Sequence, residues 1–390
     1  MLKNHNIICF GFADWDNPFR TNQHHIMKRL AVQNRVLFVE SLGLRQPVFQ
    51  KKDILRIFKR LIKGLRGIKK INENLYVYSP LVIPFHKFYL IRKLNNFILK
   101  NAIRKIQKKL SFTRPILWGY VPNIVDFKKF FDEKLTVYHC VDELSANPLI
   151  PGAVVSQKEN ELIKTADIVF FTSKPLYEKK KILNKNTYYL PNVADFEHFS
   201  KVWREKLNIP EEIKNIKKPV IGFVGAISKY KIDFSIIEYI LQTHRDWSLV
   251  FIGALGEGEK ALDISNFSKY RNFYYLGPKP YSELPSYLSY FDVCIMPNLI
   301  NEYTKNMFPL KFFEYLSTGK PVVAIDLPSL EEFRKYFYSA TDKNSFVQKI
   351  EEALNESSEE LKIKRIEIAR QFTWEKRIEE MSEIINKFLK

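Results

Sequence analysis

Short apolar runs of strand length recur along the first half of the chain, and stretches with helical spacing of apolar residues separate most of them. A run of β-branched and aromatic residues between turn formers is typical of a buried strand, whereas apolar residues three and four positions apart predict a helix. We predict a helix over residues 22–33 and strands over residues 7–10, 36–39, 75–79, 116–118, 136–140, 168–172 and 187–190. This alternation favours a largely parallel, doubly wound sheet.

The alternation starts again in the second half, where Gly or Pro closely follows each predicted strand. These strands cover residues 220–224, 248–252, 272–276, 292–296 and 322–325. Glycine lets a loop approach a ligand closely, and ligands of parallel sheets bind at the carboxyl ends of the strands. Because a chain of 390 residues is too long for one compact core, we predict two domains of the same α/β class.

A turn-rich segment at residues 191–199 separates the two halves. We place the first domain at residues 1–195 and the second at residues 196–372. The remaining residues, 373–390, predict a final helix, for which Thr373 is a suitable N-cap. One face of this helix carries its apolar residues, Ile378, Met381, Ile385 and Phe388.

The composition indicates a folded protein, because 46% of the residues are hydrophobic and 14% are aromatic. No apolar run approaches the roughly 18–20 residues of a membrane span, and the N-terminus lacks a basic-then-apolar signal pattern. We therefore expect the chain to stay in the cytosol. Its three cysteines, Cys9, Cys140 and Cys294, lie far apart in strand-like runs and predict buried, reduced thiols.

Positive charge is concentrated near the N-terminus. Residues 1–110 contain 23 Lys and Arg against 5 Asp and Glu, a net charge of +18, whereas the rest of the chain contains 39 against 38. Two segments, Lys51–Lys70 and Ile91–Leu110, carry most of this charge among apolar residues at helical spacing. No recognised nucleic-acid-binding module accompanies them, which disfavours a nucleic-acid partner.

A basic amphipathic helix is typical of a membrane-surface element. We therefore expect the first segment, Lys51–Lys70, to contact an anionic membrane. The alternative is a solvated basic face whose apolar stripe packs on its own domain. We make no membrane prediction for Ile91–Leu110. The apolar face expected there consists of Leu94, Ile98, Ala102 and Ile106.

The most informative stretch surrounds Lys311 and Glu314, which lie three positions apart, so that a helix places them on one face. Pro309 suits the first turn of this helix, and Gly319 and Pro321 suit its end. The unpaired N–H groups at a helix N-terminus suit an anion such as a diphosphate, which leaves Glu314 to accept hydrogen bonds from a ribose diol. The alternative is a surface ion pair on an ordinary amphipathic helix.

Residues 306–323 resemble the donor-binding motif of nucleotide-sugar glycosyltransferases with the GT-B fold, in particular the family 4-like enzymes of the bacterial cell surface. The resemblance extends across residues 190–324 and includes the interdomain signature at residues 191–199. It implies two Rossmann-like domains and a final helix that crosses back to the first domain. In the family, a carboxylate eight residues before the ribose-binding Glu touches the donor sugar. Here that position is Asn306.

The loop after the strand at 220–224 also resembles a family motif, in which Arg follows a Gly and a Lys comes five residues further on. In this chain Ala226 follows Gly225, and Lys231 occupies the Lys position. The resemblance implies that Lys231 contacts the diphosphate and that Lys311 substitutes for the missing Arg.

Two further loops complete the expected donor side. The loop at residues 276–285 resembles the base-binding edge of the family, where Tyr281 either stacks on the base or staples the following helix. The polar loop at residues 298–308 would cover the sugar and the diphosphate. Asn306 and Pro309 would line the donor with these loops.

The acceptor side is expected in the first domain. Residues 14–25 resemble an aromatic-rich family loop, from which Arg20, Gln23 and His24 would reach the cleft. The alternative is that these side chains cap and solvate the start of a helix. The Asp-Trp-Asp tripeptide at residues 14–16 matches a metal-binding motif of a different glycosyltransferase fold, and outside that fold we interpret it as a coincidence.

A polar cluster at residues 138–145 follows another predicted strand. Asp142 resembles an acid that the family keeps at this place. It could accept a hydrogen bond from the acceptor hydroxyl or orient His139, and both are therefore catalytic candidates with Lys311. An N-cap role for Asp142 or Ser145 is the alternative.

We therefore expect a metal-independent, retaining GT-B glycosyltransferase that moves a sugar from a nucleoside diphosphate sugar to a glycan or lipid-linked glycan acceptor at the inner face of the membrane. The resemblance implies no cofactor, because lysines and a helix N-terminus would stabilise the departing diphosphate. A nucleotide-sugar epimerase on the same fold would use the same donor site without an acceptor. A non-enzymatic membrane or polyanion adaptor would explain the basic region but not the phosphate-type loops.

Overall fold

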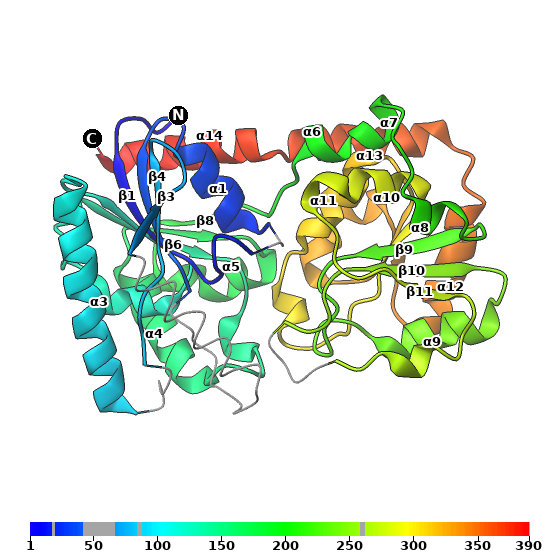
Figure 1. Ribbon diagram of the computed structural model, residues 1–390, viewed down its shortest axis with the longest axis horizontal. Coiled ribbons are helices and arrows are strands. Elements are labelled where there is room, and N and C mark those ends of the chain that lie inside the picture. The colour runs from blue at the N-terminus through cyan, green and yellow to red at the C-terminus, as the bar shows by residue number, and fades with distance from the viewer. Residues whose placement is uncertain (18–19, 42–66, 84–87, 258–261, 390) are drawn as a thin grey trace. The chain divides into compact units, whose positions relative to one another are not determined.

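Figure 1 shows a computed structural model of the chain, which describes residues 1–17, 20–41, 67–83, 88–257 and 262–389. The chain divides into two compact units. Unit 1 comprises Met1–Pro191 and Arg377–Lys390, and unit 2 comprises Asn192–Lys376. Both are α/β units built on a sheet of mainly parallel strands, so the predicted pair of Rossmann-like domains is confirmed. The C-terminal residues return to unit 1 from Arg377 onward.

The sheet of unit 1 has the strand order β3-β4-β2-β1-β5-β6-β7-β8, and neighbouring strands are parallel except for β3 with β4. Its strands are β1 (Asn6–Phe10), β2 (Arg35–Val39), β3 (Ile68–Lys70), β4 (Leu75–Tyr78), β5 (Ile116–Gly119), β6 (Leu135–Cys140), β7 (Ile168–Phe171) and β8 (Thr187–Tyr189). Its helices are α1 (Asn22–Leu30), α3 (Tyr89–Lys109), α4 (Gly152–Thr165), α5 (Lys174–Lys180) and most of α14 (Trp374–Leu389). Every residue of β5, β6 and β7 is buried, as expected for parallel strands covered on both faces.

The sheet of unit 2 is parallel throughout, with the order β11-β10-β9-β12-β13-β14. Its strands are β9 (Val220–Val224), β10 (Ser248–Ile252), β11 (Phe273–Tyr275), β12 (Val293–Met296), β13 (Val322–Ile325) and β14 (Tyr338–Ala340). Its helices are α6 (Phe196–Phe199), α7 (Lys201–Arg204), α8 (Glu211–Lys214), α9 (Phe234–Thr243), α10 (Leu284–Tyr290), α11 (Leu310–Ser317), α12 (Lys343–Leu354) and α13 (Glu359–Gln371).

The strand order of unit 2 reverses between β9 and β12. From β9 the chain first builds the sheet outward through β10 and β11, then returns to the other side of β9 and continues through β12, β13 and β14. At such a switch point the loops after the two central strands leave in opposite directions, and the crevice between them is where open α/β sheets bind ligands. The loop after β9 begins with Gly225, and the polar loop after β12 leads into α11.

The first basic segment, Lys51–Lys70, lies largely outside the described residues. Its described end, Ile68–Lys70, forms strand β3 and therefore does not continue a helix. The second segment forms the long helix α3, but its buried face differs from the expected one. The residues of α3 that are buried are Asn95, Leu99, Ile103 and Ile106, whereas Leu94 and Ile98 are exposed.

All three cysteines are free and buried, which confirms the prediction of reduced thiols. Cys9 lies in β1, Cys140 ends β6, and Cys294 lies in β12. Burial raises the pKa of each thiol, so none is a ready nucleophile. Within the described part of the chain, no helix is long and apolar enough to cross a bilayer.

Candidate functional site

The start of α11 carries the two residues on which the donor prediction depends. Pro309 is its N-cap residue, and the helix ends just before Gly319, whose φ of +74° is the left-handed conformation common after helix ends. Lys311 and Glu314 lie one turn apart and are half-buried. Among the described residues, neither side chain has a hydrogen bond or an ion pair, so the alternative of a surface ion pair does not apply. The ring of Phe223 faces the lysine, with its centroid 5.1 Å from Nζ.

Gly225 makes room for Lys311 at the end of β9. A Cβ atom at Gly225 would lie 2.9 Å from Cε and 3.0 Å from Nζ of Lys311, and its φ of +150° disfavours any other residue. The neighbouring strand ends in the same way, because a Cβ at Gly253 would lie 1.8 Å from the carbonyl oxygen of Gly225. The two glycines therefore let the ends of β9 and β10 approach each other while the ammonium group of Lys311 lies against the first of them.

The electrostatics of this site favour the arrival of an anion. Burial, and then the charge of Lys231, lowers the pKa of Lys311. Burial also raises the pKa of Glu314, to which the nearby charge of Asp195 contributes. Each group is therefore harder to ionise than usual. An anion beside Lys311, or hydrogen-bond donors beside Glu314, would stabilise the charged forms.

Lys231, the second expected diphosphate contact, is already paired. Its Nζ lies 2.5 Å from Oε2 of Glu257, which also accepts a hydrogen bond of 2.8 Å from the hydroxyl of Tyr230. Burial acts to raise the pKa of Glu257, but Lys231 and Tyr230 outweigh it and lower that pKa. Sequence reasoning missed Glu257, although it follows Gly256 in the loop after β10, beside the loop that carries Lys231.

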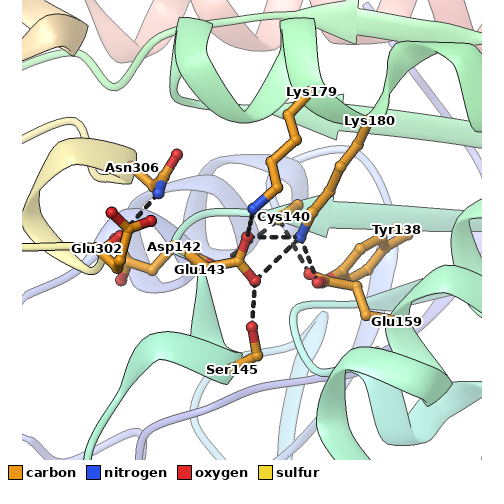
Figure 2. A network of polar contacts seen from close by, with 10 residues as sticks. All are labelled: Tyr138, Cys140, Asp142, Glu143, Ser145, Glu159, Lys179, Lys180, Glu302 and Asn306. Atoms are coloured by element: carbon orange, nitrogen blue, oxygen red, sulfur yellow. Dashed lines mark hydrogen bonds and ion pairs between the residues drawn. The ribbon is translucent and has the colours of Figure 1, made fainter. Parts of the chain in front are cut away.

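Tyr281 and Asn306 are held by contacts within unit 2. The ring of Tyr281 stacks on His198 with centroids 4.6 Å apart and an interplanar angle of 14°. Its backbone carbonyl also accepts a hydrogen bond of 2.8 Å from His198. These contacts support the alternative in which Tyr281 fixes the start of the following helix. Asn306 is buried and donates a hydrogen bond of 2.7 Å to the carbonyl of Glu302 in its own loop (Figure 2).

The expected acceptor residues of unit 1 make structural contacts at the start of α1. The buried Gln23 accepts a hydrogen bond of 2.9 Å from the N–H of Phe12. His24 accepts one of 3.1 Å from the N–H of Thr21, and burial lowers the pKa of this imidazole to about 4. Arg20 donates one of 3.1 Å to the carbonyl of Trp15. For Gln23 and His24, these contacts match the capping alternative better than a role in acceptor binding.

The structure gives no support to catalysis by His139. Its ring is fully buried among the aromatic rings of Trp118, Tyr120 and Phe170. Neither ring nitrogen has a hydrogen-bond partner among the described residues, so the expected contact with Asp142 is absent. Burial, and then the charge of Arg377, lowers the pKa of His139 to about 3, which keeps the imidazole neutral. Since β6 is buried on both faces, this side chain points into the core.

A buried ionic network next to Asp142 was not predicted (Figure 2). Nζ of Lys180 lies 2.5 Å from Oε2 of Glu159 and 3.0 Å from Oε2 of Glu143. The hydroxyl of Tyr138 donates a hydrogen bond of 2.6 Å to Glu159. Burial acts to lower the pKa of Lys180, but neighbouring negative groups outweigh it and raise that pKa. The network ties α4 and α5 to the segment after β6 and thereby fixes the backbone that carries Asp142.

No group of three or more His, Cys, Asp or Glu side chains in the described ranges has the geometry of a metal site. The backbone carbonyl of Asp14, in the tripeptide that matches a metal-binding motif, accepts a hydrogen bond of 3.0 Å from Nε2 of His24. The described side chains at the switch point of unit 2 include Lys231 and Lys311, whose positive charge suits a phosphate, and the carboxylates of Glu257 and Glu314.

Unit 2 is similar in sequence to a known protein family. Residues 218–356 match the family described as glycosyl transferases group 1. The chain is 27% identical over 281 residues to the putative teichuronic acid biosynthesis glycosyltransferase TuaH of Bacillus subtilis, a match that covers 67% of this chain and 69% of TuaH.

Solved structures of low sequence identity have the same fold over nearly the whole chain. Sucrose-phosphate synthase of Thermosynechococcus elongatus superposes with a TM-score of 0.72 at 14% identity and covers 99% of both chains. Anabaena HepE, solved in complex with UDP, has a TM-score of 0.68 at 14% identity and covers 98% of this chain and 100% of its own. An Escherichia coli trehalose-6-phosphate protein, bound with UDP-2-fluoro glucose, has a TM-score of 0.67 at 12% identity and covers 97% and 98%.

Proposed function

We propose that this chain, which is a glycosyltransferase of the GT-B fold, uses a nucleoside diphosphate sugar as its donor. The observation that carries this proposal is the arrangement of Lys311 and Glu314 beside Gly225 at the switch point of unit 2. HepE and the Escherichia coli relative were solved with UDP or a UDP-sugar, which supports the same donor class here.

In this proposal, each group of the site has a defined task. The first N–H groups of α11 and the ammonium of Lys311 bind the diphosphate, while the carboxylate of Glu314 accepts hydrogen bonds from the ribose hydroxyls. When the bond from the anomeric carbon to the diphosphate breaks, negative charge grows on the leaving oxygen. Lys311 and the helix N-terminus stabilise that charge, and the transfer needs no metal ion. Lys231 assists only when the ligand draws it away from Glu257.

We infer that the acceptor is a glycan or lipid-linked glycan in the synthesis of a cell-surface polysaccharide. The similarity to TuaH, whose description names teichuronic acid biosynthesis, supports this class. Asp142 is our candidate for the group that accepts a hydrogen bond from the attacking hydroxyl, because the ionic network of unit 1 fixes its backbone. We propose retention of the anomeric configuration, which NMR analysis of the first-formed product tests.

The donor proposal is tested by thermal shift with UDP, GDP, ADP, CMP and dTDP. A site occupied at 100 times its Kd adds about 2.7 kcal/mol to the free energy of unfolding, a shift of a few degrees for a chain of this size. We expect one nucleoside diphosphate to stabilise the wild type and Lys335→Ala, an exposed lysine of the same unit, but not Lys311→Ala. Equal shifts in all three proteins, or none in the wild type, would refute the assignment.

A further inference from the structure

Helix α3 presents a row of large apolar side chains to solvent. Leu90 is 76% exposed and Phe97 is 67% exposed, and Leu94 lies between them at helical spacing. Ile98 and the residues at the helix start, Phe88 and Tyr89, are exposed as well. The inward face of the same helix, with Leu99 and Ile103, is buried in the core of unit 1. The helix therefore has two apolar faces, of which the fold uses one.

A row of this kind differs from the scattered apolar residues that all protein surfaces carry. Single exposed residues such as Ile182 need no explanation, whereas a contiguous apolar stripe on one helix marks a surface that binds something. Figure 1 shows α3, in cyan, along the left edge of unit 1 in that view. The stripe occupies the first turns of α3, from Leu90 to Ile98.

The charge of α3 identifies what binds there. The helix contains seven Lys and Arg and no Asp or Glu. Beyond the apolar stripe, the outward face continues as Lys105, Lys108 and Lys109, all exposed. A second copy of this chain would bring two such basic helices together and is disfavoured by repulsion. An anionic bilayer fits both the apolar stripe and the basic end of the helix, because apolar side chains enter its interface and lysines remain among its headgroups.

We propose that α3 docks unit 1 on an anionic membrane surface. Leu90, Leu94 and Phe97 insert at the boundary of headgroups and acyl chains, and the basic half of the helix lies against the headgroups. The inference rests on the proposed function in one respect, because a lipid-linked acceptor would be met at this surface. It does not depend on the chemistry of the donor site.

The test is flotation of the full-length protein with vesicles of phosphatidylcholine alone or mixed with phosphatidylglycerol. We expect binding to the mixed vesicles that weakens with added salt. Two variants separate the contributions of the helix. Leu90→Ser combined with Phe97→Ser removes the centre of the stripe, and Lys105→Glu combined with Lys108→Glu reverses two charges. Each pair should lower binding about tenfold or more, whereas the matched control Ile182→Ser, an apolar residue of unit 1 that is 88% exposed, should bind like the wild type.

Three results would overturn the proposal: no binding by the wild type, equal binding by the Leu90/Phe97 variant and the control, or binding indifferent to phosphatidylglycerol. A dimer that dissociates in the Leu90/Phe97 variant would assign the stripe to a second copy instead. The thermal shift with nucleotide, measured on the same proteins, keeps the two proposals apart. A variant that no longer binds vesicles but is still stabilised by the nucleotide in the thermal-shift measurement is folded and has lost the docking surface alone.

Discussion

Each unit contains a lysine with a largely desolvated side chain, and the two lysines differ in whether a carboxylate pairs with them. Lys180 in unit 1 lies between the carboxylates of Glu143 and Glu159, and its pKa is raised. Lys311 in unit 2 has no ion pair among the described residues, and its pKa is lowered. The first charge is neutralised by two ion pairs, whereas the second feels the carboxylates of Glu314 and Glu257 without a direct ion pair in the described part of the chain.

This difference separates a structural charge from a binding charge. A buried cation with two carboxylates fixes the elements that carry them, and removing the cation takes its compensating charge from both carboxylates. A desolvated cation without a counter-ion costs the free protein stability, which an anionic ligand then recovers on binding. Lys231 stands between these cases, because Glu257 neutralises it from a neighbouring loop that a ligand could displace.

Breaking the network of unit 1 should have the largest effect on stability. Lys180→Met leaves the buried Glu159 without an ion pair and Glu143 with only the longer contact to Lys179, and it should lower the free energy of unfolding by about 3–5 kcal/mol. The adjacent residue supplies a control, because the side chain of Lys179 is 60% exposed and its Nζ lies 3.6 Å from Glu143. Lys179→Met should cost less than about 1 kcal/mol. Urea unfolding of both variants measures the difference, and similar losses would mean that Lys180 is not the centre of the network.

The equivalent change in unit 2 should act on binding and leave stability intact. Lys311→Met removes a desolvated charge that forms no direct ion pair with any described residue, so we expect unchanged or slightly higher resistance to urea. Loss of a charge-assisted contact should weaken binding of the nucleoside diphosphate by about 1.5–3 kcal/mol, a factor of roughly 10–150. Calorimetric titration measures this, with Lys335→Met as the control. A variant that unfolds as readily as Lys180→Met would place Lys311 with the structural lysines.

The contrast between the two lysines also explains what the sequence could reveal. Most strands were predicted because their apolar runs are long and largely buried, whereas the short strands β3 and β14 were not predicted. The α11 site was predicted because Pro309, Lys311, Glu314 and Gly319 lie within one short segment. The partners of Lys180 lie 21 and 37 residues away in the sequence, so no local spacing announces them. Glu257 and Lys231 are also distant in the sequence. They form an ion pair because the loops after the adjacent strands β9 and β10 lie side by side.

Local pattern also failed where the direction of a side chain mattered. His139 belongs to a polar cluster at the end of a strand, and nothing in that cluster indicates that its ring points into an aromatic core. In α3 the apolar residues are numerous enough for two faces, and the sequence favoured the face with Leu94 and Ile98. The fold buries the face with Leu99 and Ile103, because those side chains meet the sheet of unit 1.

A smaller effect should follow from releasing Lys231. Glu257→Gln keeps an acceptor for the hydroxyl of Tyr230 but removes the charge that competes with a phosphate for Lys231. Because both partners are partly exposed, we expect nucleotide affinity to rise by no more than about 1 kcal/mol. Glu367→Gln, which changes an exposed carboxylate of the same unit, should leave affinity unchanged. Weaker binding by Glu257→Gln would show that Glu257 positions Lys231 for the ligand and does not compete with it.

The finest test is the pH dependence of the pair Lys311 and Glu314. The pKa of Glu314 is raised in the folded chain. Between the ordinary pKa of Glu and this raised pKa, the folded chain therefore binds more protons than the unfolded chain, and stability falls as the pH rises. The pKa of Lys311 is lowered in the folded chain. Between this lowered pKa and the ordinary pKa of Lys, the unfolded chain therefore binds more protons than the folded chain, and stability rises with pH. Between the two windows both groups are charged, and the pair contributes least to stability.

Nucleotide binding should follow the opposite course, because it needs the ammonium and the carboxylate together. We expect affinity to be highest between the raised pKa of Glu314 and the lowered pKa of Lys311, and to decline on either side. The double variant Lys311→Met and Glu314→Gln isolates the contribution of the pair. The free energy of unfolding of the wild type, relative to this variant, should be lowest at the pH at which the wild type binds the nucleotide most tightly. The network of Lys180 should behave in the opposite way. Glu143, which is paired with Lys180, has a lowered pKa, so its contribution to stability is present at neutral pH and is lost only in acid. A stability difference that does not vary with pH would mean that the charges of unit 2 are compensated in the free protein, as those of unit 1 are.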